Sequence, residues 1–283
     1  MPRRLRLALL TAHRVASGFI RHDGLSWAAA IAFWLVLSLP PLLIALTTIS
    51  TSLLGAETAR DLVADQVAAH LPTGSGLIEQ IVDAELPLFG TASLGSLAFL
   101  LFSGSRVFGA LARAINVMWH HVESDGLLRR LVIRVVLLLF VGGLVIASAL
   151  LQLGLLGAAD DIGPLADIVA RLVLPTALVV AGLTLTYRLI PADGPTWATA
   201  LTGALVATAL LRLAQAGFAF LLATVLEFDQ AYGPLAGVAV LMIWAVAACA
   251  VVLIGAEVVA TLDRHRLRHL PLPASETGEP SEQ

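Results

Sequence analysis

The sequence has no lysine and little charge of either sign. Charged residues make up 13% of the 283 residues, whereas apolar residues make up 58%. Soluble domains carry roughly 25% charged residues, so these proportions exclude a single water-soluble globule. Disordered, collagen-like and coiled-coil chains are excluded by the same composition. An integral membrane protein is the class that remains.

Cysteine is nearly absent as well, since Cys249 is the only one. A single thiol forms neither a disulfide framework nor a cysteine-based zinc site within one chain. The sequence also lacks the phosphate-binding loop of nucleotide-binding proteins, which argues against ATP-driven transport by this chain alone. We therefore expect no metal, no cofactor and no catalytic residues.

Long apolar runs are abundant. A membrane-spanning helix needs about 20 mainly apolar residues, and a backbone surrounded by lipid must satisfy its own hydrogen bonds within a helix. Six stretches qualify: 26–54, 94–111, 132–156, 168–189, 198–222 and 235–262. The sequence therefore predicts an all-α polytopic membrane protein with six transmembrane helices in a domain of residues 23–262. No internal repeat is apparent, so an inverted-repeat transporter is not indicated.

Three segments lie outside these spans. Residues 1–22 are basic, with apolar residues at helical spacing, which predicts an amphipathic helix on the cytoplasmic membrane surface. The outer loop 55–93 contains two stretches of amphipathic helical pattern that could cap the outer mouth of the bundle. The tail 263–283 is rich in proline, serine and glutamate and is expected to be a disordered cytoplasmic tail.

The positions of the 17 arginines predict the orientation. Thirteen lie before the first span, between spans two and three, between spans four and five, or after the sixth span. The loops on the other side contain only Arg60 and Arg171, together with most of the acidic residues. Because cytoplasmic loops of membrane proteins carry the excess of positive charge, both termini are expected in the cytoplasm.

The two remaining arginines, Arg106 and Arg212, lie deep within predicted spans. Arg106 shares a helical face with Arg113 and Asn116, and Gln215 lies on the same face as Arg212. Each of the two is about 20 Å from a membrane surface at a rise of 1.5 Å per residue. A guanidinium at that depth costs at least about 2.5–3.5 kcal/mol, so both should face protein or water.

The acidic residues do not match these arginines. Glu257 is the only carboxylate within the spans, and its depth suits Arg113 or Arg188 better than Arg212. One interpretation of the excess positive charge is a cavity that accepts a phosphate or carboxylate of an amphipathic molecule. The alternative is that both arginines bind backbone carbonyls freed at helix kinks. The sequence leaves the two interpretations open.

Such a kink is expected at Pro40 and Pro41, near the middle of the first span. Two consecutive prolines remove two backbone donors and disfavour helical geometry in the preceding residue. A straight helix over the 29 residues of this span would measure about 43 Å, against a hydrocarbon core of about 30 Å. A break or strong kink would reconcile the lengths, and would either expose backbone groups to a substrate or serve packing alone.

Several short motifs in chain order resemble the YihY/BrkB family of bacterial inner-membrane proteins. They are Asp23 with AAAIAF at 28–33, SLPPL at 38–42, RAIN at 113–116 with Trp119, RLIP at 188–191 with Trp197, Gly203-Ala204, YGPLAG at 232–237, Trp244, and GAE at 255–257. The sequence departs from the family at Phe33-Trp34, where tyrosine is common. The resemblance covers about residues 20–262 and implies a six-helix fold in the inner membrane.

The resemblance implies little about activity. Members of the family have been labelled ribonuclease BN, a label generally regarded as mistaken, linked to virulence or serum resistance, or proposed to move lipid-like envelope components. We therefore consider first a transporter or flippase of an anionic amphipathic or lipid-like envelope component, whose partners are membrane lipids. The alternative is a non-transporting scaffold that uses small residues such as Gly142, Gly143, Gly154 and Gly157 for helix contacts.

An enzyme, specifically a ribonuclease, is the third possibility. The cytoplasmic side offers His120, His121, Glu123 and Asp125 in one short loop. Their spacing is not that of a known metal site, and a solvated loop pair is the simpler interpretation of the two histidines. The cytoplasmic arginines are explained by topology and require no nucleic acid. We expect no enzymatic activity, and the sequence leaves the oligomeric state open.

Overall fold

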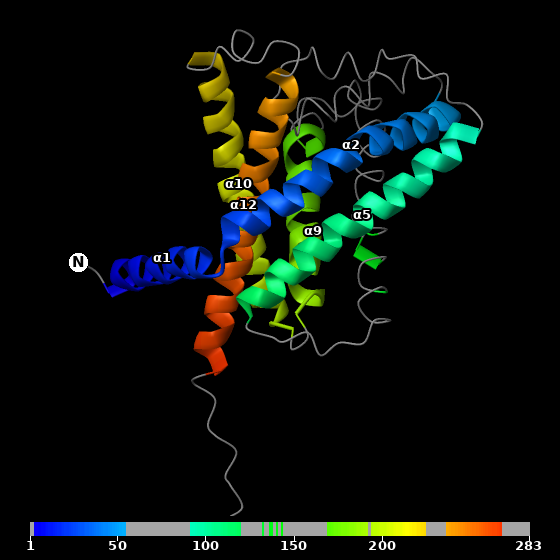
Figure 1. The fold of residues 1–283 in the computed structure, drawn as a ribbon. Helices are drawn as coiled ribbons and strands as arrows, with labels where there is room; N and C mark the ends of the chain where they lie inside the picture. Colours follow the sequence, from blue (N-terminus) through cyan, green and yellow to red (C-terminus); the bar gives the residue numbers. More distant parts are fainter. Residues whose placement is uncertain are drawn as a thin grey trace, which may run out of the picture.

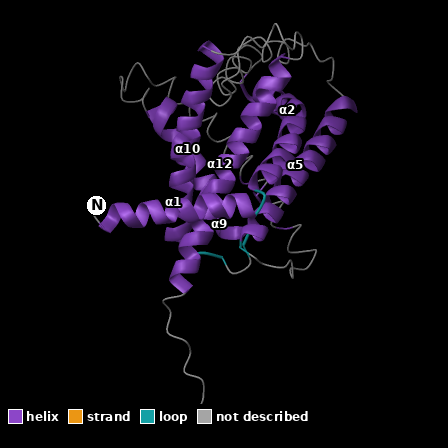
Figure 2. Ribbon diagram, turned by 60° about the vertical axis from the view of Figure 1, so that its left-hand side comes forward, coloured by secondary structure: helices purple, strands orange, loops and turns teal. Residues whose placement is uncertain are grey.

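A computed structural model gives the fold as a bundle of helices (Figure 1). It describes residues 3–54, 91–119, 132, 136, 137, 140, 143, 169–191, 194–224 and 236–267. The helices are α1 (Arg3–Arg21), α2 (Gly24–Leu54), α5 (Thr91–Met118), α9 (Leu174–Leu189), α10 (Trp197–Thr224) and α12 (Ala236–Leu267), with a π-helical turn η1 (Val169–Val173) before α9. The described residues contain no strand, which confirms the all-α prediction (Figure 2).

Three of the helices are long and apolar enough to cross a membrane, over Gly24–Leu42, Trp197–Leu222 and Gly237–Arg264. The apolar helix Leu174–Leu189 is shorter. Of the third expected span, the structure describes only five positions, all helical. Residues 55–90 of the expected outer loop 55–93 and residues 268–283 of the expected tail 263–283 lie outside the described residues, whereas residues 91–93 belong to α5 and 263–267 to α12. The count of six spans therefore stays a prediction.

The helices pack in a continuous series. α2 lies between α5 and α12, α12 also packs against α10, and α10 packs against α9. Helices α9, α10 and α12 run in similar directions, whereas α2 and α5 lean away from them side by side (Figure 1). α1 crosses this direction and packs mainly against α12. The order of neighbouring helices is therefore α5, α2, α12, α10 and α9, with α5 and α9 farthest apart in this series.

Small residues bring α10 and α12 into close contact. A Cβ atom on Gly203 would overlap Val259 and lie 2.9 Å from the backbone oxygen of Gly255. Tyr187 of α9 is fully buried beside this contact and donates a hydrogen bond of 2.7 Å to the Val252 carbonyl. Without side chains at the two glycines the backbones approach closely, which is how membrane helices gain packing energy.

The prolines of α2 do not end the helix. α2 is a helix of 31 residues that continues through Pro40 and Pro41, so the chain is not broken there, whereas a kink stays a prediction. Proline has no N–H group, so the carbonyl four residues earlier loses its helical hydrogen bond. The helix nevertheless continues on both sides of the two prolines. Nearby, the Ser38 hydroxyl donates to the Leu35 carbonyl at 2.7 Å.

α1 is helical as expected, and its position on the membrane surface stays a prediction. Val15 and Gly18 are buried against the bundle, while Ile20 is 76% exposed on another side of the helix. The chain turns into α2 at Asp23, which has a positive φ of 53°. Aspartate tolerates this left-handed conformation better than most residues, and its carboxylate accepts a hydrogen bond from Ser26 at 2.9 Å.

α5 extends beyond the expected second span, in agreement with the helical face predicted for Arg106, Arg113 and Asn116. The second span was expected to end at residue 111, but the helix continues to Met118. The extension places Arg113 and Asn116 on the same helix as Arg106.

Candidate functional site

Arg212 lies between α9 and α10 and is half-buried. Its Nη2 donates to the Thr176 hydroxyl at 2.8 Å, and its Nη1 donates to Gln215 Oε1 at 3.3 Å. The Thr176 hydroxyl in turn donates to the Leu172 carbonyl at 2.6 Å. The guanidinium is therefore oriented by two neutral side chains, one from each helix. Because both acceptors are neutral, no described residue compensates the positive charge of Arg212.

A groove of about 1040 Å³ runs beside Arg212. Its lining is mainly apolar, and Arg212 is the only charged residue among the described residues that line it. The lining residues are Phe140, Leu172, Val173, Thr176, Ala177, Val180, Ala181, Thr184, Leu185, Trp197, Leu201, Leu205 and Arg212. The groove thus combines a long apolar surface with a single positive charge.

Trp197 marks the other end of this groove. It lies fifteen residues before Arg212 on α10, a separation of about 22 Å along the helix axis. The Arg188 guanidinium lies over the Trp197 ring, 5.6 Å from its centroid. This cation–π contact places a second arginine next to the groove, at the end where α9 finishes and α10 begins.

Arg106 lies elsewhere in the bundle. Its guanidinium is exposed and lies over two aromatic rings, 5.7 Å from the centroid of Trp34 and 5.1 Å from that of Phe102. Trp34 belongs to α2 and Phe102 to α5, and the two rings contact each other edge to face at 6.1 Å. Arg106 is not among the described residues that line the α9–α10 groove. The structure therefore does not bring Arg106 and Arg212 together.

Arg113 and Asn116 follow Arg106 on α5. Arg113 is exposed, while Asn116 is half-buried. The Oδ1 atom of Asn116 is buried and has no hydrogen-bond partner among the described residues. Neither residue lines the groove beside Arg212 in the part of the chain that the structure describes.

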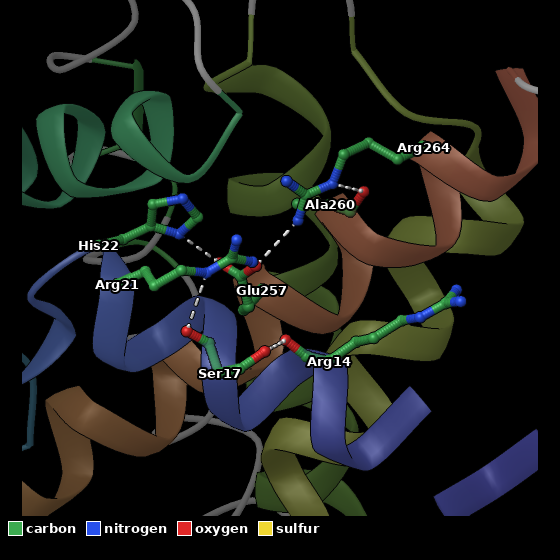
Figure 3. A network of polar contacts seen from close by, with 7 residues as sticks. All are labelled: Arg14, Ser17, Arg21, His22, Glu257, Ala260 and Arg264. Atoms are coloured by element: carbon green, nitrogen blue, oxygen red, sulfur yellow. Dashed lines mark hydrogen bonds and ion pairs between the residues drawn. The ribbon is translucent and has the colours of Figure 1, made fainter. Parts of the chain in front are cut away.

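Glu257 of α12 lies at a third position, where α1 crosses α12 (Figure 3). Its side chain is fully buried. Arg264 Nη2 lies 2.9 Å from Oε1, and His22 Nδ1 lies 3.1 Å from Oε2. The sequence-based match of Glu257 to Arg113 or Arg188 was wrong. Arg264, two helical turns further along α12, and His22, which follows α1, contact the carboxylate instead.

Further hydrogen bonds order the residues around this contact, which we call the Glu257 junction (Glu257, His22, Arg264 and Gly18). Arg264 Nε donates to the Ala260 carbonyl at 3.2 Å. On α1, Arg21 Nε donates to the Ser17 carbonyl at 3.3 Å (Figure 3). Gly18 faces Glu257 so closely that a Cβ there would overlap its Oε1. The junction therefore fixes where α1 crosses α12.

Sequence reasoning missed the role of His22 and Arg264. Arg264 follows Glu257 by seven residues, a spacing that places both on one helical face and could have indicated the pair. His22 is 235 residues away in the sequence, and no local pattern marks it. Since both oxygens of the buried carboxylate have partners, Glu257 does not balance the charge of Arg106 or Arg212.

The described residues include no group of three or more His, Cys, Asp or Glu side chains that could hold a metal ion. His120, His121, Glu123 and Asp125 lie outside the described residues. Of the glycines expected to serve helix contacts, only Gly143 is described, and a Cβ there would meet no atom within 4 Å.

Comparison with known proteins decides the family. The sequence profile of the family described as Virulence factor BrkB matches residues 15–278. The chain belongs to the BrkB family. The matched range contains α2, α5, α9, α10, α12 and the whole Glu257 junction, but of α1 only residues 15–21.

Curated relatives of this BrkB family chain are named as membrane proteins. It is 28% identical over 280 residues to a UPF0761 membrane protein of Rhodospirillum centenum, covering 94% of this chain and 60% of the relative. It is 29% identical over 259 residues to a UPF0761 membrane protein of Chlorobium luteolum, covering 88% of this chain and 59% of the relative. It is 25% identical over 273 residues to a UPF0761 membrane protein of Aeromonas salmonicida, covering 88% of this chain and 93% of the relative. The chain thus spans about three-fifths of the length of the first two relatives. No solved structure matches it.

These names establish a membrane protein of the UPF0761/BrkB type. None of the three names an enzymatic activity, a substrate or a partner.

Proposed function

We propose that the protein binds an anionic amphipathic molecule, such as a lipid-like envelope component, in the α9–α10 groove and moves it across the inner membrane. The observation that carries the proposal is Arg212, which places one positive charge in an otherwise apolar groove of about 1040 Å³. Small-molecule pockets measure about 300–1000 Å³, so a groove at the upper limit suits a molecule with long apolar chains.

The charge of Arg212 argues for an anionic group. Thr176 and Gln215 orient the guanidinium but bring no negative charge. A guanidinium presents five N–H donors in a planar arrangement, and two of its nitrogens bind a carboxylate or phosphate side by side. A hydrogen bond to a charged group contributes about 1.5–3 kcal/mol, which would offset part of the cost of a charge at this depth.

Glu257 argues in the same direction. The only carboxylate predicted within the spans is bound to Arg264 and His22 at the junction with α1. It is therefore not available to neutralise Arg212, and a ligand would supply the missing negative charge. The alternative from the sequence, in which Arg212 binds backbone carbonyls freed at helix kinks, finds no support in its hydrogen bonds, which go to two side chains.

The proposed orientation has both termini in the cytoplasm. It follows from the arginine distribution and from the positive-inside rule. The end of α5, the end of α9 and the beginning of α10 lie toward the same side of the bundle as the end of α12 (Figure 1), as this orientation requires. In this orientation α1 lies along the cytoplasmic membrane surface, and the groove extends from Trp197 near that surface to Arg212 at mid-depth.

Reconstitution in vesicles tests the transport proposal. Vesicles of phosphatidylcholine with a small fraction of fluorescent phosphatidylglycerol report the movement of the labelled lipid between leaflets, with protein-free vesicles as background. We expect wild type to raise the rate above background and Arg212→Gln to lower that rate about tenfold or more, as loss of a charge-assisted hydrogen bond implies. Leu213→Ala, at an exposed position beside Arg212, serves as the control and should leave the rate unchanged.

Two results would decide against transport. Wild-type protein that leaves the labelled lipid at the background rate contradicts the proposal. If, in addition, crosslinking in membranes recovers a protein partner in a fixed ratio, the chain is a scaffold instead.

A further inference from the structure

The cluster of Arg106, Trp34 and Phe102 is another place where a positive charge has no acidic partner among the described residues. Arg106 lies over both rings, at 5.7 Å and 5.1 Å from their centroids. An aromatic face attracts a cation but takes up none of its N–H donors in a conventional hydrogen bond. The guanidinium is exposed, so its donors are accessible from outside the bundle.

The surface around this cluster is apolar. The exposed Phe33 contacts the Trp34 ring with centroids 5.3 Å apart, and the exposed Phe99 contacts the Phe102 ring at 6.5 Å. Leu37 of α2 and Leu101 of α5 are also exposed. In a membrane protein such a surface faces the hydrocarbon chains of lipids, where an unpaired charge is costly. An anionic headgroup on Arg106 would remove this cost, and its acyl chains would lie on the adjacent aromatic and aliphatic side chains.

Arg113 extends the cluster toward one end of α5. It is also exposed and lies seven residues further along the same face of the helix, a distance of about 10.5 Å. Asn116 follows after three more residues. In the proposed orientation these polar residues connect Arg106 with the cytoplasmic surface, where lipid headgroups lie.

The cluster is separate from the α9–α10 groove. α5 packs chiefly against α2, and α12 lies between α2 and α10. The described residues lining the groove include Arg212 and neither Arg106, Trp34 nor Phe102. A single ligand in the groove therefore does not account for Arg106.

We infer that the cluster of Arg106, Trp34 and Phe102 is a second, independent site, which binds the anionic headgroup of a phospholipid from the surrounding bilayer, with Arg113 as its entrance. The inference rests on the proposed function in one respect, since both sites use a deep arginine to bind an anionic headgroup. It adds that one chain binds two such lipids and not one shared between the two arginines.

Counting bound lipids by native mass spectrometry tests this inference. The full chain, in detergent, is titrated with phosphatidylglycerol or with phosphatidylcholine of the same acyl chains. We expect wild type to bind two phosphatidylglycerol molecules well above the background of phosphatidylcholine. Arg106→Gln and Arg212→Gln should each retain one, and the double variant should retain none.

Two further variants serve as controls. Arg106→Lys keeps a cation over the two rings and should retain two lipids, which also shows that position 106 tolerates substitution. Arg21→Gln removes an exposed arginine of α1 and should leave the number of bound phosphatidylglycerol molecules at two. Arg113→Gln should keep two lipids but weaken the binding of the one that Arg106 holds.

The outcomes separate the two proposals. If wild type binds one phosphatidylglycerol that only Arg212→Gln removes, the second site is wrong and the groove proposal stands. If either single substitution removes all binding, the arginines share one site. If phosphatidylcholine binds as well as phosphatidylglycerol, both proposals are wrong. A wild-type dimer that loses its contact in Arg106→Gln would show that a second copy, and not a lipid, covers the cluster.

Discussion

Gly18 lies where α1 crosses α12, and its replacement by alanine should loosen α1 from the bundle. A Cβ atom at this position would overlap Oε1 of Glu257 and lie 2.7 Å from its Cδ. The carboxylate is fully buried and bound at 2.9 Å to Arg264 and at 3.1 Å to His22. It therefore cannot move aside without lengthening at least one of these contacts.

The expected loss of docking free energy follows from two destabilising contributions and one that offsets them. Forcing an extra methyl group into a packed contact costs about 1–3 kcal/mol. Lengthening a hydrogen bond to a charged group forfeits part of the about 1.5–3 kcal/mol that such a bond contributes. Alanine is intrinsically about 1 kcal/mol better than glycine within a helix, which offsets part of the loss. We expect the docking of α1 to weaken by about 2 kcal/mol, which is roughly a 30-fold increase in its undocked population.

Trypsin provides the assay because the chain has no lysine, and cleavage occurs only after arginine. Arg14 and Arg21 lie within α1, so cleavage after them requires local unfolding of this helix. In detergent, Gly18→Ala should be cut there roughly 30 times faster than wild type, as the undocked population implies. Gly217→Ala is the matched control, because a Cβ at Gly217 meets no atom within 4 Å and the rate should not rise. Equal rates for Gly18→Ala and wild type would refute the role given to the junction.

Three other substitutions test the packing of the bundle. Glu257→Gln keeps the shape of the side chain but removes the charge that binds Arg264 and His22, so we expect a lower melting temperature in detergent and faster cleavage after Arg21. Tyr187→Phe removes the hydrogen bond to the Val252 carbonyl and should lower the free energy of unfolding by about 1–2 kcal/mol, measured by denaturant titration. Gly203→Ala places a methyl group against Val259 and should lower the melting temperature, whereas Gly217→Ala should not.

Much of the fold could be predicted from composition and periodicity. Apolar runs of about 20 residues have few alternatives to helices in a membrane, so α2, α10 and α12 appear close to their expected positions. α5 continues past residue 111, where the second span was expected to end, and the shared helical face of Arg106, Arg113 and Asn116 already indicated this continuation. A helix that emerges from the membrane carries polar residues in its last turns.

The site could be predicted only where its contacts are local. The pairing of Arg212 with Gln215 follows from a spacing of three residues, and Phe102 precedes Arg106 by four. Contacts between helices have no such pattern, so Thr176, Trp34 and His22 were not indicated as partners. The partners of Glu257, the one carboxylate predicted within the spans, could not be predicted because they depend on the contact between α1 and α12.

The affinity of the α9–α10 groove for an anionic headgroup tests the central claim most directly. Equilibrium binding is measured for fluorescent phosphatidylglycerol and phosphatidylcholine of the same acyl chains, with the full chain in detergent and Arg106 replaced by Gln so that the groove is observed alone. We predict binding of phosphatidylglycerol about tenfold or more tighter than that of phosphatidylcholine, and loss of this difference when Arg212 is also replaced by Gln. Equal affinities for the two lipids in the protein that retains Arg212 would contradict the account.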